Sequence, residues 1–472
     1  LTKNQKILKN PATTKTDSPR VRELKHKARN YSIKDGMFAS AKTSLGYNYI
    51  SPLAIAINAS NSIVAMLSAV TGILGPLSQI FGSRLIEKYN RKKILAKAVL
   101  AEVLMWIPFL TIALLFYFNI LTEILPLALL LIFSLYTIVN NLGHPAWFSW
   151  MGDIVDEKYR GRWFAKRNLL LGFVSIIVGI TSAIFLDFTK EKNLTMFGFT
   201  ALFIIALISR TISLRSIKKQ YEPKIKLKKG YYFSFLDFLL APKDNFKTFS
   251  IYRFFLNIAC SISTPLLAVY LLRFLEFEYT AYMIITFAPT VFSLIVLELW
   301  GKFADKYGNY KILAISSIFI PLLPILWILS PNIIYLILIP SFVSGISWAG
   351  FNLATSNFIY DNISQQKRSL AVSYFNMLAG IGTFIGAGIG AILIKYLTID
   401  ITAPIIAIFI FGSLMRMIVV FFIIPQINEI KETEKFEGGR TLKNLILTEA
   451  KPTLIEEAHQ IMSIKKYIHV KE

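Results

Sequence analysis

Two stretches of this chain, DIVDEKYRGRWFAKRNLLLG at residues 153–172 and DNISQQKRSLAVSYFNMLAG at residues 361–380, carry the same polar residues at the same spacing. Each stretch runs from the end of one long apolar segment into the start of the next. The matching positions, each pair separated by 208 residues, are Asp153 and Asp361, Arg160 and Arg368, Asn168 and Asn376, and Gly172 and Gly380. Two homologous halves in one lipid-embedded chain indicate a pseudo-symmetric protein with its working site between the halves, as in transporters built from repeats.

A second repeated set lies nearer the start of each half. The residues of this set, separated by 218 positions, are Glu87, Lys88, Tyr89 and Lys93 in the first half and Asp305, Lys306, Tyr307 and Lys311 in the second. Two independent sets of matching polar residues support a duplicated architecture.

The composition excludes an ordinary soluble protein. Hydrophobic residues make up 54% of the 472 residues and charged residues only 17%, whereas soluble proteins have roughly 45–50% apolar and about 25% charged residues. A net charge of +23 would indicate nucleic-acid binding in a soluble protein, but here the basic residues fall in short segments between apolar runs. We therefore expect a membrane protein that contacts lipids and does not bind nucleic acid.

The apolar runs set the number of membrane spans, because a helix needs about 20 mostly apolar residues to cross roughly 30 Å of hydrocarbon. The runs are 36–58, 62–82, 94–118, 125–150, 168–187, 195–214, 248–272, 280–301, 311–330, 332–358, 369–396 and 401–424. The predicted fold class is an all-α integral membrane protein with twelve transmembrane helices in two pseudo-symmetric six-helix bundles.

Basic residues cluster in the loops after even-numbered spans, whereas the other loops hold only scattered cations. By the positive-inside rule, we expect a cell-membrane protein with both termini in the cytoplasm. The predicted parts are a basic N-tail at 1–34, a six-helix bundle at 35–215, a basic linker at 216–247, a second bundle at 248–424 and a C-tail at 425–472. The N-tail lacks the apolar core of a cleavable signal and is expected to be disordered or to lie on anionic lipid. The C-tail is expected to form an amphipathic helix on the membrane or packed under the bundle, and the alternative is a solvated helix with no function.

The loop sequence GKFADKYGNYK at residues 301–311 resembles the loop signature of the major facilitator superfamily, in which a glycine, an acid, a second glycine and basic residues follow in order. Its counterpart SRLIEKYNRKK at residues 83–93 matches more loosely, since Ser83 and Asn90 stand where glycines are expected. With the twelve spans and the basic linker, the resemblance covers about residues 35–424. It implies a secondary transporter that works by alternating access.

The resemblance also implies a gate at the cytoplasmic side. In the family, the acidic loop motif and an arginine-rich loop form an ion-pair latch that closes this side when the cavity faces outward. The candidate gate residues here are Glu87, Arg91, Asp153, Arg160, Arg162, Asp305, Asp361 and Arg368. The alternative is that these charges only set the topology and are solvated.

Three of the charged residues within the predicted spans are functional candidates, because a charge inside the membrane costs roughly 2.5–3.5 kcal/mol. Lys42 and Arg253 lie at similar depths in the first and seventh spans, which predicts a cationic cavity for an anionic group unless both side chains reach the interface instead. Glu102 in the third span is a candidate for proton coupling, because burial and nearby cations act oppositely on a carboxyl group. It is equally suited to a static ion pair.

Further candidates for the substrate or ion pathway are the polar or aromatic residues Asn141, His144, Asn257, Trp348 and Asn352. A histidine can carry protons near neutral pH, although lone polar residues in a membrane often only bridge helices. Arg210 and Arg416 are expected to mark the cytoplasmic ends of spans six and twelve.

Motifs of other function classes are absent from the sequence. There is no phosphate-binding loop, no His-Glu-x-x-His pair and no nucleophile elbow, and the single cysteine, Cys260, allows no disulfide framework. We expect a monomeric transporter rather than an enzyme, with a small-molecule substrate, membrane lipids and protons as its partners, and no cofactor or metal. The substrate is expected to be an organic anion or a nutrient. The alternative within transport is an exporter of lipophilic or drug-like compounds. The alternative outside transport is a receptor or scaffold that binds without turnover.

Overall fold

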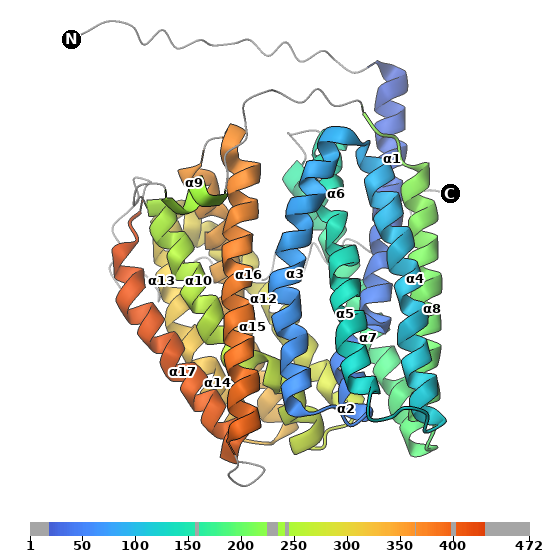
Figure 1. The fold of residues 1–472 in the computed structure, drawn as a ribbon. Helices are drawn as coiled ribbons and strands as arrows, with labels where there is room; N and C mark the ends of the chain where they lie inside the picture. Colours follow the sequence, from blue (N-terminus) through green and yellow to red (C-terminus); the bar gives the residue numbers. More distant parts are fainter. Residues whose placement is uncertain are drawn as a thin grey trace, which may run out of the picture.

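The computed structural model describes residues 18–155, 160–223, 235–240, 245–363, 365–397 and 403–429. All regular elements within these ranges are helices, and eleven of the helices are long and apolar enough to cross a membrane. The segment predicted as the first span is also helical but interrupted. The described residues thus confirm the predicted fold class of two six-helix bundles (Figure 1).

The first span consists of three consecutive helices, α1 (Pro19–Leu45), the short helix η1 (Tyr47–Tyr49) and α2 (Ile50–Ala56). The break after α1 lies at Gly46, where an added Cβ would meet the Trp106 ring at 2.2 Å. A glycine is therefore required where this turn packs against its neighbour. The break is followed by the polar residues Tyr47, Asn48 and Ser51.

Residues 19–34 differ from the expected disordered tail, because they form the first half of α1. Ser18 caps this helix by accepting a hydrogen bond from the amide of Val21 at 3.4 Å, and Pro19 follows at the first helical position. The helix is also held by packing, since Ala28 and Ser32 are buried and α1 contacts two later helices of its bundle. Residues 1–17 lie outside the described residues, as does the predicted C-terminal helix beyond residue 429.

The first bundle continues after α2 with long helices that cross it in alternate directions. They are α3 (Asn61–Lys88), α4 (Arg91–Tyr117), α5 (Leu125–Leu142), which continues as α6 (His144–Ile154), α7 (Arg160–Glu191) and α8 (Thr195–Lys219). The linker contributes one short described helix, α9 (Phe235–Leu240).

The second bundle repeats this order, with more interruptions at prolines. Its elements are α10 (Asn245–Ser263), η3 (Thr264–Leu266), α11 (Leu267–Val269), η4 (Tyr270–Phe274), α12 (Tyr279–Tyr307), α13 (Asn309–Phe319), η5 (Ile320–Leu322), α14 (Leu323–Ile328), α15 (Ile333–Asn362), α16 (Gln365–Tyr396), α17 (Ala403–Ile423) and η6 (Ile424–Gln426). Pro265 lies in η3 and Pro321 in η5, because proline removes a backbone donor and disrupts regular α-helix.

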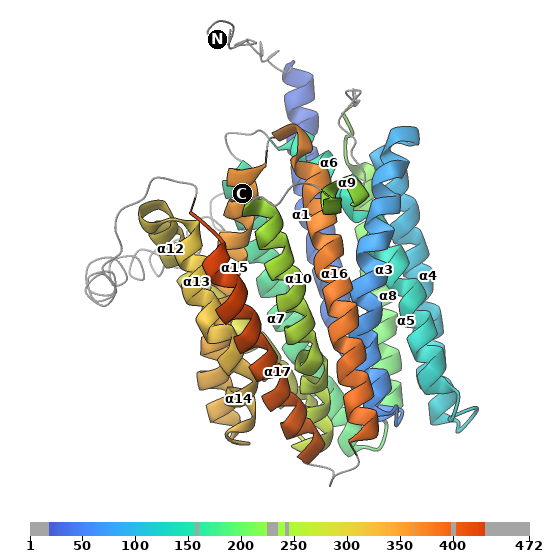
Figure 2. The same cartoon turned by 60° about the vertical axis from the view of Figure 1, so that its left-hand side comes forward.

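The two bundles meet along two pairs of helices, α3 with α16 and α7 with α12. Both views show α3 and α16 side by side (Figures 1 and 2). We call the end of the protein where α1 begins and the Lys/Arg clusters lie the basic end, and the other end the opposite end. At the opposite end α2 also contacts α11 and η4, so the bundles touch there through their first and seventh spans as well.

The hydrophobic core is shared at the opposite end and divided at the basic end. One buried cluster joins residues of both halves, for example Tyr49 and Leu53 with Tyr270 and Tyr279. Toward the basic end, one cluster around Trp150 belongs to the first half alone, and another around Phe358 belongs to the second half alone. The halves are therefore packed into one body at the opposite end and into two bodies at the basic end.

Candidate functional site

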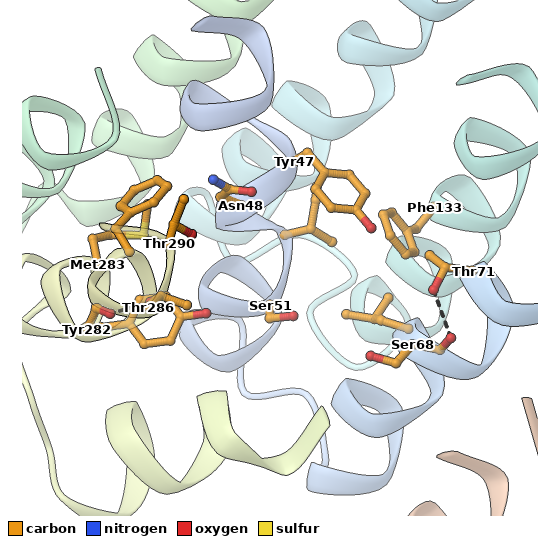
Figure 3. Close-up of a pocket in the computed structure, with 13 residues that line it drawn as sticks. Tyr47, Asn48, Ser51, Ser68, Thr71, Phe133, Tyr282, Met283, Thr286 and Thr290 are labelled. Atoms are coloured by element: carbon orange, nitrogen blue, oxygen red, sulfur yellow. Dashed lines mark hydrogen bonds between the residues drawn. The ribbon is translucent and has the colours of Figure 1, made fainter. Parts of the chain in front are cut away.

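A cavity of about 360 Å³ lies between the two halves. Four elements line it: the interrupted first span, α3 and α5 from the first half, and α12 from the second. The lining residues are Tyr47, Asn48, Ile50, Ser51, Leu67, Ser68, Thr71, Phe133, Tyr282, Met283, Thr286, Phe287 and Thr290. Figure 3 shows Asn48 and Ser51 on the first span between the α12 residues on one side and Ser68, Thr71 and Phe133 on the other.

Helical periodicity explains how these side chains come to share one space. Tyr282, Thr286 and Thr290 are four residues apart on α12, so their side chains lie on one face of the helix. Ser68 and Thr71 are three apart on α3, with the same result. Each half thus presents a face of hydroxyl groups to the cavity.

The cavity wall is polar but uncharged. None of its thirteen lining residues is charged, and eight carry a hydroxyl or amide group. Two of these groups are satisfied within their own helices: Thr71 Oγ1 donates to the carbonyl of Ser68 at 2.8 Å, and Thr286 Oγ1 donates to the carbonyl of Tyr282.

The other six polar side chains of the wall form no hydrogen bond with another described residue. They are Tyr47, Asn48, Ser51, Ser68, Tyr282 and Thr290. Donors and acceptors inside a protein normally have partners, so these six groups are available to water or to a bound solute.

An aromatic wall separates the cavity from a buried group of charges in the first half. The rings of Tyr47 and Phe133 lie 6.3 Å and 6.1 Å from the ring of Tyr136. On its far side, Tyr136 donates a hydrogen bond from its hydroxyl to Oε1 of Glu102 at 3.3 Å. Tyr136 therefore contacts both the cavity wall and the charges behind it.

Glu102 is the centre of this charged group. Its Oε1 lies 2.8 Å from Lys42 Nζ, and its Oε2 lies 2.6 Å from Arg210 Nη2 and accepts a hydrogen bond from Arg210 Nε at 2.7 Å. Lys42 also donates to the Tyr136 hydroxyl at 3.1 Å. All four residues are buried, so both oxygens of the carboxylate are matched by cations rather than by solvent.

Asp35 joins the group through a hydroxyl instead of a cation. Ser213 donates from Oγ to Asp35 Oδ1 at 2.6 Å and accepts from Arg210 Nη1 at 2.9 Å. Arg167 of α7 is nearby: its guanidinium lies 4.6 Å from the centre of the Trp147 ring, and Gly36 leaves room for it, because an added Cβ would lie 2.5 Å from Nη2. Among the described residues, Asp35 thus has a neutral group as its direct hydrogen-bonding partner.

Lys42 and Glu102 are the pathway candidates that the structure brings together, but none of the eight candidates lines the cavity. Asn141 accepts from Gln79 at 3.0 Å and joins α5 to α3, and Asn257 donates to the carbonyl of Ala379 at 3.1 Å and joins α10 to α16. Both therefore bridge helices. His144 begins α6.

The candidates on α10 and α15 lie in the second half. Trp348 packs edge-on against Phe351, with ring centres 5.4 Å apart, and Asn352 is exposed. The Arg253 guanidinium lies 4.9 Å from the centre of the Phe351 ring. Its Nε and Nη1 atoms are buried without a hydrogen-bonding partner in the described part of the chain.

The expected positions of Arg210 and Arg416 at the ends of their spans are wrong, because both side chains are buried inside the bundles. Arg210 binds Glu102. Arg416 donates to the carbonyls of Ile320 and Cys260 at 3.3 Å and 3.0 Å and to the Ser263 hydroxyl at 3.0 Å. The Ile320 carbonyl also accepts from the Leu323 amide, and the Cys260 carbonyl also accepts from the Thr264 hydroxyl at 2.8 Å, so Arg416 adds a second donor to each where α10 and α13 give way to short helices.

The opposite end of the cavity is closed by polar contacts between the halves. Asp187 on α7 accepts hydrogen bonds from the first two backbone amides of α12, those of Tyr279 and Thr280, each at 2.8 Å. Arg273 donates to the Ala59 carbonyl at 2.8 Å and to the Asn61 side chain at the start of α3. Carboxylates favour the positive end of a helix, so the Asp187 contact stabilises the closed arrangement.

At the basic end, the described gate candidates pair within their own halves. Arg91 is buried and binds Asp153 at 2.7 Å, and Asp361 accepts from Asn309 at 2.7 Å. The side chains of the remaining gate candidates lie outside the described part of the structure; these are Glu87, Arg160, Arg162, Asp305 and Arg368. The latch between these charges stays a prediction.

The sequence-based predictions missed the residues that line the cavity, because the candidates were charged, amide, histidine and tryptophan residues and not residues with hydroxyl groups. A signal was present, since three residues with hydroxyl groups at intervals of four follow one face of α12. The Asp35–Ser213–Arg210 connection was missed because Asp35 lies on α1, far in the sequence from Arg210 and Ser213 on α8.

Comparison with known proteins agrees with this architecture. A family model described as the Major Facilitator Superfamily matches residues 249–463. Among curated protein sequences, none matches the chain.

Several solved structures share the fold at low sequence identity. The nucleoside transporter NupG is 14% identical, with a TM-score of 0.60, and the alignment covers 85% of this chain and 98% of that one. A D-xylose-proton symporter is 13% identical, with a TM-score of 0.65 and coverages of 87% and 99%. A bacterial homolog of the human lysosomal transporter Spinster, in an inward-facing and unoccupied conformation, is 13% identical, with a TM-score of 0.55 and coverages of 87% and 96%. The second half of the chain thus matches the model of the Major Facilitator Superfamily, and the chain as a whole shares the fold of these solved transporters.

Proposed function

We propose that this protein is a secondary transporter that moves a small solute across the cell membrane by alternating access of its two six-helix bundles. The observation that carries the proposal is the cavity between the halves, which is lined by both and lies beside contacts that close one end. Pockets of roughly 300–1,000 Å³ are typical of small-molecule sites. The family and the transporters with the same fold support the same function.

The divided core at the basic end supports an arrangement in which solute enters or leaves there. The halves share a core at the opposite end only. With the Lys/Arg clusters in the cytoplasm by the positive-inside rule, and with both termini there as well, this conformation faces the cytoplasm. Rocking the halves about the cavity would open the opposite end and bring the gate residues of the basic end together.

Coupling to protons belongs to the same proposal, and two buried carboxylates are its candidates. Protonating Glu102 would break its contacts with Lys42 and Arg210, whereas Asp35 has only a hydroxyl as a direct partner among the described residues. The charged groups around Asp35 are Arg210 on α8, Arg167 on α7 and Glu102 on α4. Asp35 is therefore the better candidate for a proton that binds and leaves in each cycle, with Glu102 holding the cations in place.

The test of transport is counterflow in proteoliposomes containing the purified protein. Vesicles are loaded with an unlabelled solute, and uptake of a trace of the same labelled solute is followed. A transporter should accumulate the label transiently, whereas a receptor or scaffold would bind without exchange. Binding with no exchange for any bound solute would overturn the proposal.

Export of lipophilic compounds is the second candidate, and the exposed aromatic residues alone do not favour it, because lipid-facing helices carry them too. The uncharged hydroxyl lining of the cavity favours a hydrophilic solute instead. The direction of transport is tested by comparing inside-out with right-side-out vesicles in the same assay, with an imposed proton gradient.

A further inference from the structure

We infer that the cavity selects a neutral ring compound with several hydroxyl groups, as in a monosaccharide or the sugar of a nucleoside, and excludes organic anions and cations. The inference rests on the proposed function, because it assigns a substrate class to the cavity between the halves. It replaces the cationic cavity that the sequence suggested.

The wall of the cavity offers no charged side chain to a bound solute. The thirteen described lining residues include neither an acid nor a base. The nearest buried cation of the first half, Lys42, is bound to Glu102 at 2.8 Å behind the Tyr136 ring, and Arg253 does not line the cavity. A charged solute would therefore lose its hydration without gaining a counter-ion, which is costly inside a protein.

The polar groups of the cavity wall are mostly hydroxyls. Hydroxyl groups both donate and accept hydrogen bonds, and the wall offers unpartnered hydroxyls on both halves, at Ser51 and Ser68 on one side and at Tyr282 and Thr290 on the other. The hydroxyls of a sugar have the same dual character. A solute that bonds to both sets at once would connect the two bundles.

The cavity wall also contains aromatic rings. The rings of Tyr47, Phe133 and Phe287 line the same cavity as the hydroxyls. Phe287 is held against α7, where Gly179 leaves room for its ring because an added Cβ would approach to 2.4 Å. Apolar rings beside hydroxyls suit a solute with one C–H or aromatic face and several hydroxyls, because such sites bury most of the ligand surface on apolar groups and orient it by a few polar ones.

The experiment measures binding to the detergent-purified full chain by isothermal titration with matched pairs of compounds. The pairs are glucose with glucuronate, and uridine with uridine monophosphate, so that each differs mainly by a charged group. Tetraphenylphosphonium represents lipophilic cations. We expect at least one neutral member to bind, and its charged counterpart to bind at least tenfold more weakly. Binding of glucose would indicate a monosaccharide as the substrate, whereas binding of uridine would indicate a nucleoside.

Three variants test the site itself. Ser68→Ala and Tyr282→Phe each remove one hydroxyl with little change of shape and should weaken binding about three- to tenfold, as expected for a lost neutral hydrogen bond. Ser134→Ala on α5 is the matched control, because its hydroxyl donates to the Leu130 carbonyl of its own helix at 2.7 Å and lies outside the lining. It should leave the affinity unchanged.

The outcomes separate the substrate class from the transport proposal. Tighter binding of glucuronate, the nucleotide or the cation than of the neutral compounds would overturn the substrate class, even if that ligand also exchanges in counterflow. Binding of a neutral compound that Ser68→Ala and Tyr282→Phe do not weaken would place it outside this cavity and also overturn the inference. Neutral binding that depends on both hydroxyls, but with no counterflow, would support the substrate class and contradict transport.

Discussion

Gly72 of α3 and Gly380 of α16 bring the backbones of the two halves into direct contact. A Cβ added at Gly380 would lie 2.1 Å from the Gly72 carbonyl oxygen, and a Cβ added at Gly72 would lie 2.8 Å from the Gly380 carbonyl oxygen. Small residues permit such close helix packing in membranes. This contact lies near the middle of both helices, so it is placed where the halves must move past each other.

Replacing Gly380 by valine should separate α3 from α16, because the nearest atoms are the backbone carbonyl of Gly72 and the rigid ring of Pro76, which cannot rotate away. We expect loss of most counterflow activity with retention of the folded protein, measured by exchange rate and by size-exclusion profile. Gly388→Val on the same helix is the control, since an added Cβ there meets nothing within 4 Å. Equal activity of both variants would contradict a role for the glycine contact.

The Asp187→Asn variant should favour opening of the opposite end. An asparagine keeps one acceptor but loses the charge that faces the start of α12, and such a charge at the start of a helix contributes about 0.3–1 kcal/mol. We expect the open population to rise by up to roughly fivefold, measured by double electron–electron resonance between spin labels at positions 192 and 276. Glu191→Gln, an exposed carboxylate on the same helix, should leave the distance distribution unchanged.

Removing Glu102 should destabilise the protein more than removing Lys42. Glu102→Gln leaves Lys42 and Arg210 buried without their counter-ion, a situation that typically costs about 3–5 kcal/mol, whereas Lys42→Met leaves Glu102 paired with Arg210. The thermal midpoint of unfolding, measured for each purified variant, shows which substitution destabilises the protein more. Glu298→Gln, which loses only the half-exposed contact with Lys302, is the control and should change little. The reverse order would contradict the central role of Glu102.

Asp35→Asn should uncouple transport from the proton gradient. The amide keeps an acceptor for Ser213 but cannot gain and lose a proton, so we expect counterflow to persist while an imposed acid gradient no longer drives accumulation. Lys34→Gln, a change of charge at the neighbouring position, serves as the control. Gradient-driven uptake that survives in Asp35→Asn would remove Asp35 from the coupling mechanism.

Arg253→Met should be tolerated if the substrate is neutral. The guanidinium has two buried nitrogen atoms without partners among the described residues, and replacing a poorly paired buried charge by an apolar side chain is often neutral or stabilising. We expect an unchanged or higher thermal midpoint and an unchanged affinity for the bound neutral compound. A large loss of affinity would restore Arg253 to the substrate site.

The sequence predicted the fold well because membrane spans depend on long apolar runs, and the duplication was visible in the paired loop residues. The start of α1 was not predicted, because its polar residues resemble a disordered tail, and only contacts with α7 and α8 show that it is packed. The cavity was missed for a related reason. Serine and threonine are common in spans, and only the three-dimensional arrangement shows that Ser68 and Thr286 border the same space.

The two halves carry their buried charge differently. In the first half, Lys42 and Arg210 face Glu102, and Asp35 lies one hydroxyl away. In the second half, Arg253 and Arg416 have no carboxylate partner in the described part of the chain. A full elementary charge crossing the membrane is worth about 2.3 kcal/mol per 100 mV. If the second half moves along the membrane normal in the proposed transport cycle, these charges would do electrical work, and we expect the membrane voltage to bias the direction in which the protein faces even when its cargo is uncharged.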